Sequence, residues 1–286
     1  MTTRHFGELL AARMEAGFAV CVGLDSDHAR LPAVATDVKN VGWRSKGKQM
    51  HWFNCHIVDA VADLVVCFKP NVAFYEAHAG GFSALRETIR YIHKRFSDIP
   101  VIVDGKRTDI GSTNKGYVQS LFDYLEADAI TINPYFGAEA VMPFLEREEK
   151  GIFVLCRTSN PGAGEFQDLM VEVDIGKMPL YQVVARRVAN NWNERGNCGL
   201  VVGATYPEEL VRVRQLVGDD IPILVPGVGT QGGSVQEVVA AGKKNLIINS
   251  SSAVIFASNG SDFYGAARIV TQELHDKTQA AHAAMA

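Results

Sequence analysis

The sequence has little of what marks a secreted, membrane or nucleic-acid-binding protein. Its 286 residues include five cysteines, an odd number without a CxxC spacing, which favours free thiols in a reducing compartment over disulfides or zinc ligands. No apolar run approaches the roughly 18 residues that a membrane span requires. The 28 Lys and Arg residues do not exceed the 32 Asp and Glu residues, so there is no basic excess for nucleic acid. We therefore expect a cytoplasmic protein that binds neither membranes nor nucleic acid.

A metal-binding cluster and a signal peptide are also missing. No group of His, Cys and Glu residues has the spacing of a metal site, and the histidines are scattered. The segment 1–17 places Phe6, Leu9, Leu10 and Met14 at helical spacing among charged residues. This pattern predicts a short amphipathic helix at the N-terminus, not a signal peptide.

What the sequence does have is a regular alternation of short apolar runs with helical segments. The apolar runs, each of the length of a buried strand, cover residues 18–24, 65–70, 101–106, 129–134, 151–157, 199–203, 221–225 and 245–249. The helical segments cover residues 52–64, 82–96, 114–125, 138–147, 180–195, 207–217, 234–241 and 262–284. This alternation predicts one (β/α)8 TIM-barrel domain over residues 1–286, with an extra N-terminal helix and a loop insertion at 26–50.

A row of charges follows the predicted strands. Asp104 and Lys106 close the third strand, where residues two apart share a face, and Asp109 lies on the loop beyond. Asp25 and Lys69 end the first two strands, so all five are expected at the mouth of the barrel, where active sites of this fold lie. A structural salt bridge at a strand end is the alternative. A lysine between carboxylates stays protonated and is suited to protonate a carbanion, while a carboxylate beside a substrate carboxylate favours its loss.

A glycine-rich loop at 225–233 carries a second signal. It precedes a predicted helix and can turn backbone N–H groups, with that of Gly229 among them, toward an anion. Together with the loop after the eighth strand, it matches the phosphate site common in these barrels. A tight turn without a ligand is the alternative.

These residues resemble the orotidine 5′-phosphate decarboxylase family. Asp104-Gly-Lys-Arg-Thr-Asp-Ile110 has the family's DxKxxD-I form, and its continuation to Thr113 looks like the longer bacterial subgroup. The other matching motifs are Gly23-Leu-Asp25, Phe68-Lys-Pro-Asn71, Phe74-Tyr-Glu76, Thr158-Ser-Asn-Pro-Gly162 and Pro226-Gly-Val-Gly-Thr-Gln231. They occur in the family's order along essentially the whole chain. The resemblance implies decarboxylation of orotidine 5′-phosphate to uridine 5′-phosphate in pyrimidine synthesis.

The resemblance also implies a role for each residue of the charge row. Lys106 would donate a proton to C6 of the pyrimidine, and Asp104 would crowd the substrate carboxylate. Lys69 would bridge Asp104 and the ribose, and Asp25 would bind a ribose hydroxyl. The family needs no metal or organic cofactor, so none is expected here.

Further substrate contacts are implied for residues outside the row. Asp109, Ile110 and Thr113 would reach into the neighbouring subunit's site, which makes a homodimer with shared active sites the expected unit. Ser159 would form a hydrogen bond with the pyrimidine, and Gln231 would bind the phosphate.

The chain departs from the family's pattern at Ser252. It stands after the eighth strand, where the family usually has an arginine that grips the phosphate. A bidentate arginine–phosphate contact is among the stronger charge-assisted bonds, and serine offers a single neutral donor. If nothing replaces the arginine, we expect phosphate binding to weaken by roughly 2–4 kcal/mol.

Two other functions stay open at the level of sequence. One is a Mg²⁺-dependent phosphosugar decarboxylase or aldolase of the same barrel superfamily, which needs an additional acidic ligand. Glu76 follows the second strand but lies seven residues past Lys69, which fits that ligand poorly. The other is a barrel that binds phosphate with an impaired site or without catalysis, which only Ser252 suggests.

Overall fold

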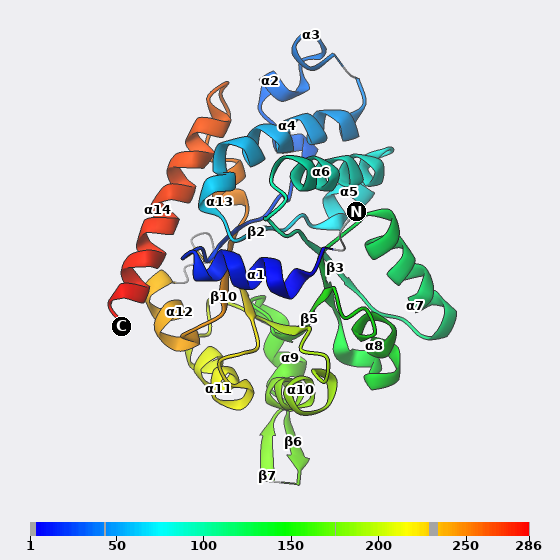
Figure 1. The fold of residues 1–286 in the computed structure, drawn as a ribbon, viewed down its shortest axis with the longest axis vertical. Helices are drawn as coiled ribbons and strands as arrows, with labels where there is room; N and C mark the ends of the chain where they lie inside the picture. Colours follow the sequence, from blue (N-terminus) through cyan, green and yellow to red (C-terminus); the bar gives the residue numbers. More distant parts are fainter. Residues whose placement is uncertain (1–3, 43, 175, 229–233, 286) are drawn as a thin grey trace.

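Eight parallel strands form the centre of the structure, a computed structural model that describes residues 4–42, 44–174, 176–228 and 234–285. The strands are β1 (Val20–Val22), β2 (Cys67–Phe68), β3 (Ile102–Arg107), β4 (Ala129–Ile132), β5 (Gly151–Arg157), β8 (Cys198–Val202), β9 (Ile223–Pro226) and β10 (Leu246–Ser250). They follow one another in the order β2-β1-β10-β9-β8-β5-β4-β3. Parallel bridges from Phe68 to Val101 and from Asn71 to Asp104 join the two ends of this order. The predicted (β/α)8 barrel is confirmed (Figure 1).

Helices surround the strands, as the alternating pattern predicts. The helices that alternate with the strands are α4 (Lys46–Val61), α6 (Gly81–Arg95), α7 (Gly111–Val118), α8 (Ala138–Leu145), α10 (Leu180–Arg187), α11 (Pro207–Val217), α12 (Val235–Gly242) and α14 (Phe263–Ala283). Two of the predicted helices, at 114–125 and 180–195, end in π-helical turns, η3 (Gln119–Tyr124) and η6 (Val188–Trp192). A wider turn of this kind shifts the direction of the side chains that follow it.

Short elements occur where the sequence gives no periodic signal. The segment 26–50, predicted as a loop insertion, contains η1 (His28–Arg30), α2 (Ala33–Thr36), α3 (Val38–Val41) and the start of α4. After β5 come η5 (Pro161–Ala163), α9 (Gly164–Gln167) and an antiparallel hairpin of β6 (Met170–Val173) and β7 (Gly176–Pro179). The other short helices are η2 (Ala62–Leu64), α5 (Val72–Glu76), η4 (Pro134–Phe136) and α13 (Ser252–Ile255). A helix of about one turn is too short to show a 3.6-residue period, so pattern analysis cannot find it.

The apolar core has two layers, one outside and one inside the barrel. The larger cluster fills the space between the strands and the surrounding helices. A smaller cluster includes Cys67, Ile102, Phe153 and Ile247 from the strands, together with Phe6 and Leu10 of α1 (Phe6–Glu15). Side chains of alternate strand residues thus fill the barrel interior, as expected for a packed barrel.

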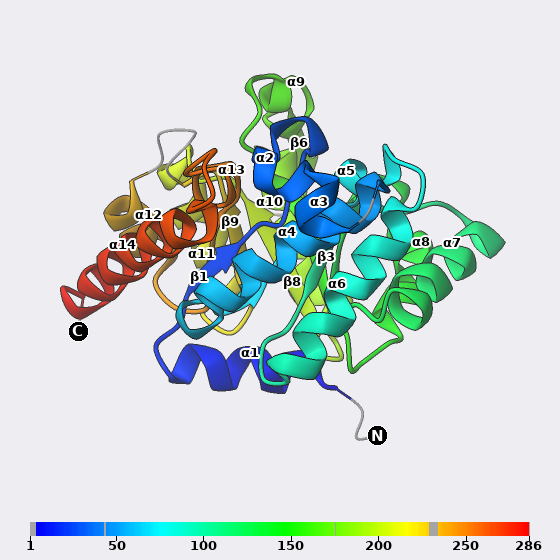
Figure 2. The same ribbon diagram turned by 90° about the horizontal axis from the view of Figure 1, so that it is seen from above.

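Helix α1 closes one end of the barrel. The rings of Phe6 and Phe153 meet edge to face with centroids 5.7 Å apart, and Gly151 leaves room for the Phe6 ring at the start of β5. Figure 2 shows α1 on one side of the barrel and the short helices α2 and α9 on the other. The N-terminal ends of the strands therefore face α1, and their carboxyl ends open on the opposite side.

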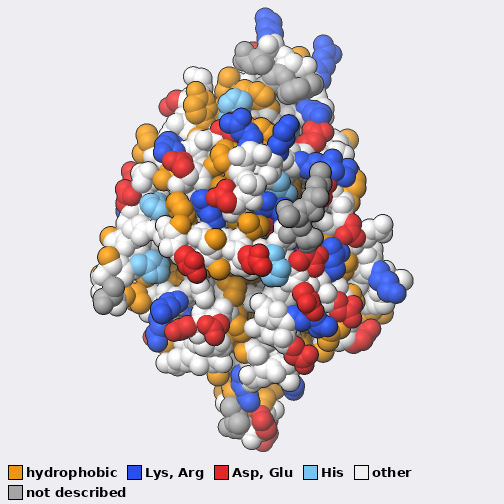
Figure 3. Space-filling view, in the orientation of Figure 1, with side chains coloured by type: hydrophobic (Ala, Val, Ile, Leu, Met, Phe, Trp, Pro, Cys, Tyr) orange, Lys and Arg blue, Asp and Glu red, His pale blue; other side chains and the backbone are white. Residues whose placement is uncertain are grey.

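The face over α1 carries acidic and basic side chains interspersed with one another (Figure 3). Within the described ranges, no helix is both long and apolar enough to cross a membrane.

Candidate active site

A buried carboxylate between two lysines lies at the carboxyl ends of β2 and β3. Asp104 Oδ2 accepts a hydrogen bond from Lys69 Nζ at 3.0 Å, and Asp104 Oδ1 accepts one from Lys106 Nζ at 2.7 Å. Thr131 Oγ1 on β4 also donates to Asp104 Oδ1, at 2.7 Å. The Lys69 side chain is 4% exposed and that of Asp104 11%, whereas Lys106 is 47% exposed. Three neighbouring strand ends therefore build one ion cluster with a single accessible ammonium group.

An irregularity in β3 sets the direction of Lys106. Val103 pairs with Ile130 and Arg107 with Ile132, so the register shifts between the two pairs. Lys106 has a φ of 48°, in the left-handed region that costs a non-glycine residue energy. Its N–H donates to Thr131 Oγ1 at 3.0 Å, which holds this conformation. The prediction that Asp104 and Lys106 lie side by side is confirmed, but a bulge, not a regular strand, brings them together.

The electrostatics of the cluster keep its buried members charged. Burial favours the neutral form of Lys69, but the carboxylates of Asp104 and Asp25 outweigh it and raise its pKa above the usual value. Burial likewise favours protonation of Asp104, but Lys69 and Lys106 outweigh it and lower its pKa below the usual value. At neutral pH the site therefore holds an ionised Asp104 carboxylate beside a protonated Lys69.

Asp25 lies beside this cluster with an oxygen that lacks a donor. It follows β1, and its Oδ1 is buried without a hydrogen-bond partner among the described residues. A buried carboxylate oxygen that accepts no hydrogen bond lowers the stability of the fold. A ligand hydroxyl is the kind of group that would satisfy it.

A pocket of about 340 Å³ opens over the cluster. Asp25, Lys69 and Asp104 line it on the side of β1 to β3, and Gly227 and Ser252 line it after β9 and β10. A wider hollow of about 530 Å³ lies beside α1 at the opposite end of the barrel, but it has no such charge row. The pocket at the strand carboxyl ends is therefore the candidate active site.

Several predicted residues are not brought to this pocket. The Asp109 carboxylate accepts a hydrogen bond from the N–H of Ile110 at 2.7 Å, and Asn114 binds the Asp109 backbone. Ile110 is 58% exposed and Thr113 is also exposed, and none of these residues lines the pocket. Their action on a partner's site stays a prediction.

The predicted contact with the base is also not seen at the pocket. Ser159 lies half-buried against Gly203 and does not line it. Gln231 and Gly229 fall outside the described residues.

Sequence reasoning missed several residues of the site, and Thr131, Phe74 and Arg30 are among them. Thr131 is the only polar residue within the apolar run of β4, and that isolated hydroxyl was the available signal. Phe74 and Arg30 line the pocket from short helices, where no periodic pattern points to them. Among the described residues, no group of three His, Cys, Asp or Glu side chains is placed to hold a metal ion.

Fold and site together define a class: a (β/α)8 barrel with a lysine-flanked carboxylate at its mouth, fit for acid–base chemistry on an anionic substrate. The chain belongs to the orotidine 5′-phosphate decarboxylase / HUMPS family, whose model matches residues 19–282.

Curated and solved relatives support this assignment. The chain is 46% identical over 268 residues to orotidine 5′-phosphate decarboxylase of Cellvibrio japonicus, covering 92% of this chain and 94% of the relative. Among solved structures, Leishmania donovani OMP decarboxylase is 33% identical with a TM-score of 0.77, covering 96% of this chain and 98% of that one. Leishmania donovani UMP synthase is 34% identical with a TM-score of 0.80; the match covers 97% of this chain and 57% of the synthase.

Proposed function

We propose that the protein decarboxylates orotidine 5′-phosphate to uridine 5′-phosphate, as the names of its relatives suggest. The observation that carries the proposal is the buried Asp104 carboxylate held at 2.7 Å from Lys106 Nζ and 3.0 Å from Lys69 Nζ. A carboxylate kept ionised in this way repels a substrate carboxylate placed beside it. Loss of CO₂ relieves that repulsion, so the repulsion raises the free energy of the bound substrate more than that of the transition state and lowers the barrier between them.

The proposed reaction uses the chain's own groups. The bond from C6 of the pyrimidine to its carboxylate breaks, CO₂ leaves, and the electron pair stays on C6. Lys106 donates a proton from Nζ to C6 and regains one from water afterwards. Lys69 stabilises the ionised Asp104 throughout.

Substrate binding is proposed for the residues around the pocket. Asp25, with its unpartnered oxygen, accepts a hydrogen bond from a ribose hydroxyl. Ser159 binds the pyrimidine, and Gln231 and Gly229 of the glycine-rich loop bind the phosphate together with the hydroxyl of Ser252. No cofactor takes part in the proposed reaction.

The Mg²⁺-dependent phosphosugar enzyme is the second candidate. Its additional acidic ligand would be Glu76, but the Glu76 carboxylate is paired with Arg107 and does not line the pocket. This pairing favours the nucleotide decarboxylase.

Decarboxylation assays test the proposal. The wild type should release CO₂ from orotidine 5′-phosphate in the presence of EDTA, and Lys106→Ala should lower the rate by about 100- to 10,000-fold, the usual contribution of a general acid. Lys94→Ala, which removes an exposed lysine on α6, serves as the control. Activity that survives in Lys106→Ala would contradict the mechanism, and activity abolished by EDTA would favour the phosphosugar enzyme.

We further propose a homodimer with shared sites. Ile110, Tyr135 and Phe136 are 58%, 85% and 52% exposed, and they follow β3 and β4 on the loops next to the charge row. Large apolar side chains exposed on neighbouring loops are typical of an interface. A second copy that covered them would meet Asp109 on the same loop.

A cytoplasmic location is also part of the proposal. All five cysteines are free thiols, and four of them are buried. Unpaired cysteines are typical of a reducing compartment.

A further inference from the structure

Arg30 lines the active-site pocket from the segment 26–50, to which no role has been given so far. It is the last residue of η1, and it lines the same pocket as Gly227 and Ser252. Its guanidinium carbon lies 4.2 Å from the centroid of the Phe256 ring. Phe256 directly follows α13, and its N–H donates to the Ser252 carbonyl oxygen at 3.3 Å. Arg30 is therefore held next to the residue that stands in the place of the expected phosphate-binding arginine.

Both the backbone and the side chain of Arg30 are fixed in place. The Asp27 carboxylate accepts from the N–H of Ala29 at 3.0 Å, and the Asp27 carbonyl accepts from the N–H of Arg30 at 3.0 Å. The Phe256 ring stacks in turn on Phe53, with centroids 5.8 Å apart at an interplanar angle of 19°. Phe53 is fully buried, so the ring under the guanidinium rests on the core. The ring contact favours one position of this exposed guanidinium, which reduces the side-chain entropy that binding of an anion would cost.

The guanidinium has donors to spare. Within the described residues the Arg30 side chain forms no ion pair and no hydrogen bond. Its contact with the ring face uses none of its N–H groups, so all of them remain able to bind an anion. Lys69, the other cation lining the pocket there, is already bound to Asp104. Three carboxylates, those of Asp25, Asp27 and Asp104, line the same pocket. A dianionic ligand would be repelled by these three carboxylates unless an unpaired cation lies beside it. Among the described residues that line the pocket, Arg30 is that cation.

We propose that Arg30 binds the 5′-phosphate of the substrate and replaces the guanidinium that is missing at Ser252. The nature of the anion, a phosphate monoester, rests on the proposed function; the presence of a cationic subsite does not. Arg30 approaches the phosphate from the β1 side, and the hydroxyl of Ser252 lies on the β10 side. The segment 26–50 thereby gains a function, since it carries the phosphate-binding cation into the pocket.

Binding of uridine 5′-phosphate and of uridine, which differ only in the phosphate, tests this subsite without relying on catalysis. By calorimetry, Arg30→Ala should weaken uridine 5′-phosphate binding by roughly 10- to 100-fold, as expected for one charge-assisted contact. Uridine binding should stay unchanged. Arg44→Ala, an exposed arginine of the same segment that does not line the pocket, should change neither affinity.

A second substitution distinguishes a lost charge from a damaged fold. In the Arg30→Ala background, Ser252→Arg should recover at least about tenfold in uridine 5′-phosphate affinity, because it returns a guanidinium to the same pocket. Equal losses for uridine and uridine 5′-phosphate, unchanged affinity in Arg30→Ala, or no recovery in the double variant would each overturn the proposal. Failure of the wild type to decarboxylate orotidine 5′-phosphate would contradict the proposed function but leave these binding results valid.

Discussion

Thr131 connects the strain at Lys106 with the charge of Asp104. Its hydroxyl donates to Asp104 Oδ1 at 2.7 Å and accepts from the N–H of Lys106 at 3.0 Å. One side chain therefore holds both the carboxylate and the bulged backbone that carries the proposed proton donor. Residues that fix a catalytic group by such contacts act on the rate more than on binding.

Removal of this hydroxyl should slow the reaction. Loss of a hydrogen bond to a charged group costs about 1.5–3 kcal/mol. Thr131→Val should therefore lower kcat by roughly 10- to 100-fold while KM changes little. Thr131→Ser keeps the hydroxyl and is the matched control, so it should retain most of the activity. Steady-state kinetics on orotidine 5′-phosphate measures both, and a Thr131→Val enzyme with the kcat of Thr131→Ser would remove Thr131 from the mechanism.

At the residue scale, the sequence predicts which charged residues lie in the site better than it predicts which groups they contact. Asp104, Lys106 and Lys69 were found because charged residues stand out at the ends of apolar runs. Arg30 was not found, because an arginine in a polar loop is an ordinary surface residue until the fold places it in a pocket. The bulge that turns Lys106 toward Asp104 was also hidden, since backbone register is a property of the strand pair.

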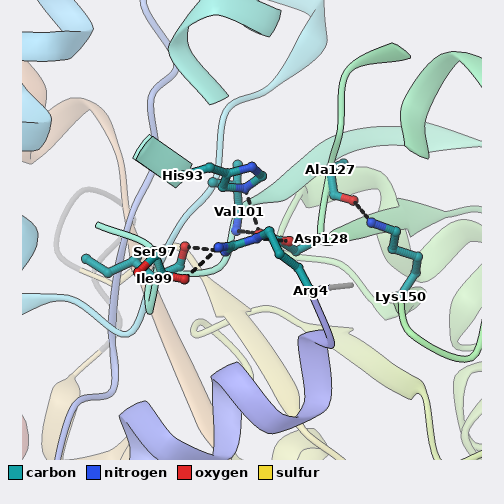
Figure 4. A network of polar contacts seen from close by, with 8 residues as sticks. All are labelled: Arg4, His93, Ser97, Ile99, Val101, Ala127, Asp128 and Lys150. Carbon is teal, nitrogen blue, oxygen red and sulfur yellow. Dashed lines mark hydrogen bonds and ion pairs between the residues drawn. The ribbon is translucent and has the colours of Figure 1, made fainter. Parts of the chain in front are cut away.

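At the scale of elements, a buried ion cluster ties the N-terminus to the closed end of the barrel. Figure 4 shows Arg4, just before α1, reaching Asp128, just before β4. The Asp128 carboxylate also accepts from the N–H of Val101 at 2.8 Å and lies 2.9 Å from His93 Nε2 on α6. Asp128 is fully buried, so one carboxylate joins α1, α6, β3 and β4. These contacts lie at the end of the barrel opposite the candidate active site, where they join α1 to the strands and to α6.

Acid should release this stabilisation. Burial favours protonation of Asp128, but the contacts with His93 and Arg4 outweigh it and lower its pKa to about 2. Because the folded pKa is lower than the unfolded one, the contribution is complete above about pH 4 and is lost as the pH falls toward 2. Relative to a usual value of 3.8, this shift corresponds to about 2–3 kcal/mol at neutral pH.

Denaturant unfolding of Asp128→Asn tests the cluster. The variant should be less stable than the wild type by about 2–3 kcal/mol at pH 7, and the difference should shrink below pH 4. Asp98→Asn, which removes an exposed carboxylate paired with Arg13, should change stability by less than about 0.5 kcal/mol. A difference between Asp128→Asn and wild type that is the same at pH 7 and pH 3 would mean that the charge of Asp128 is not what stabilises the fold.

The elements themselves show where pattern analysis succeeds. The eight strands of the barrel and the eight helices that alternate with them match the prediction, because buried strands and amphipathic helices leave an apolar period in the sequence. The amphipathic helix α1 also matches the prediction. Its position over the end of the barrel could not be predicted, because an apolar helix face does not show which surface it packs against. The β6–β7 hairpin was missed because residues such as Met170 are exposed and give no buried run.

At the scale of the whole molecule, the proposed homodimer would complete each active site with residues of a second chain. Asp104, Lys69 and Asp25 line the pocket, and Lys106 contacts Asp104 at its edge, whereas Asp109 neither lines the pocket nor contacts Asp104. If the proposed dimer supplies Asp109 from the partner, each pocket requires residues of two chains. In that arrangement, the Lys106 and the Asp109 that act on one substrate molecule would belong to different subunits.

Subunit mixing tests this arrangement directly. Lys106→Ala and Asp109→Ala should each be nearly inactive alone. When they are unfolded, mixed in equal amounts and refolded, half of the dimers are mixed and each has one intact site, so about one quarter of the wild-type activity should return. A mixture of Lys106→Ala with Asp104→Ala should recover nothing, because both residues act from the same chain. No recovery in the first mixture, with dimers present by light scattering, would place Asp109 in its own subunit's site or outside catalysis.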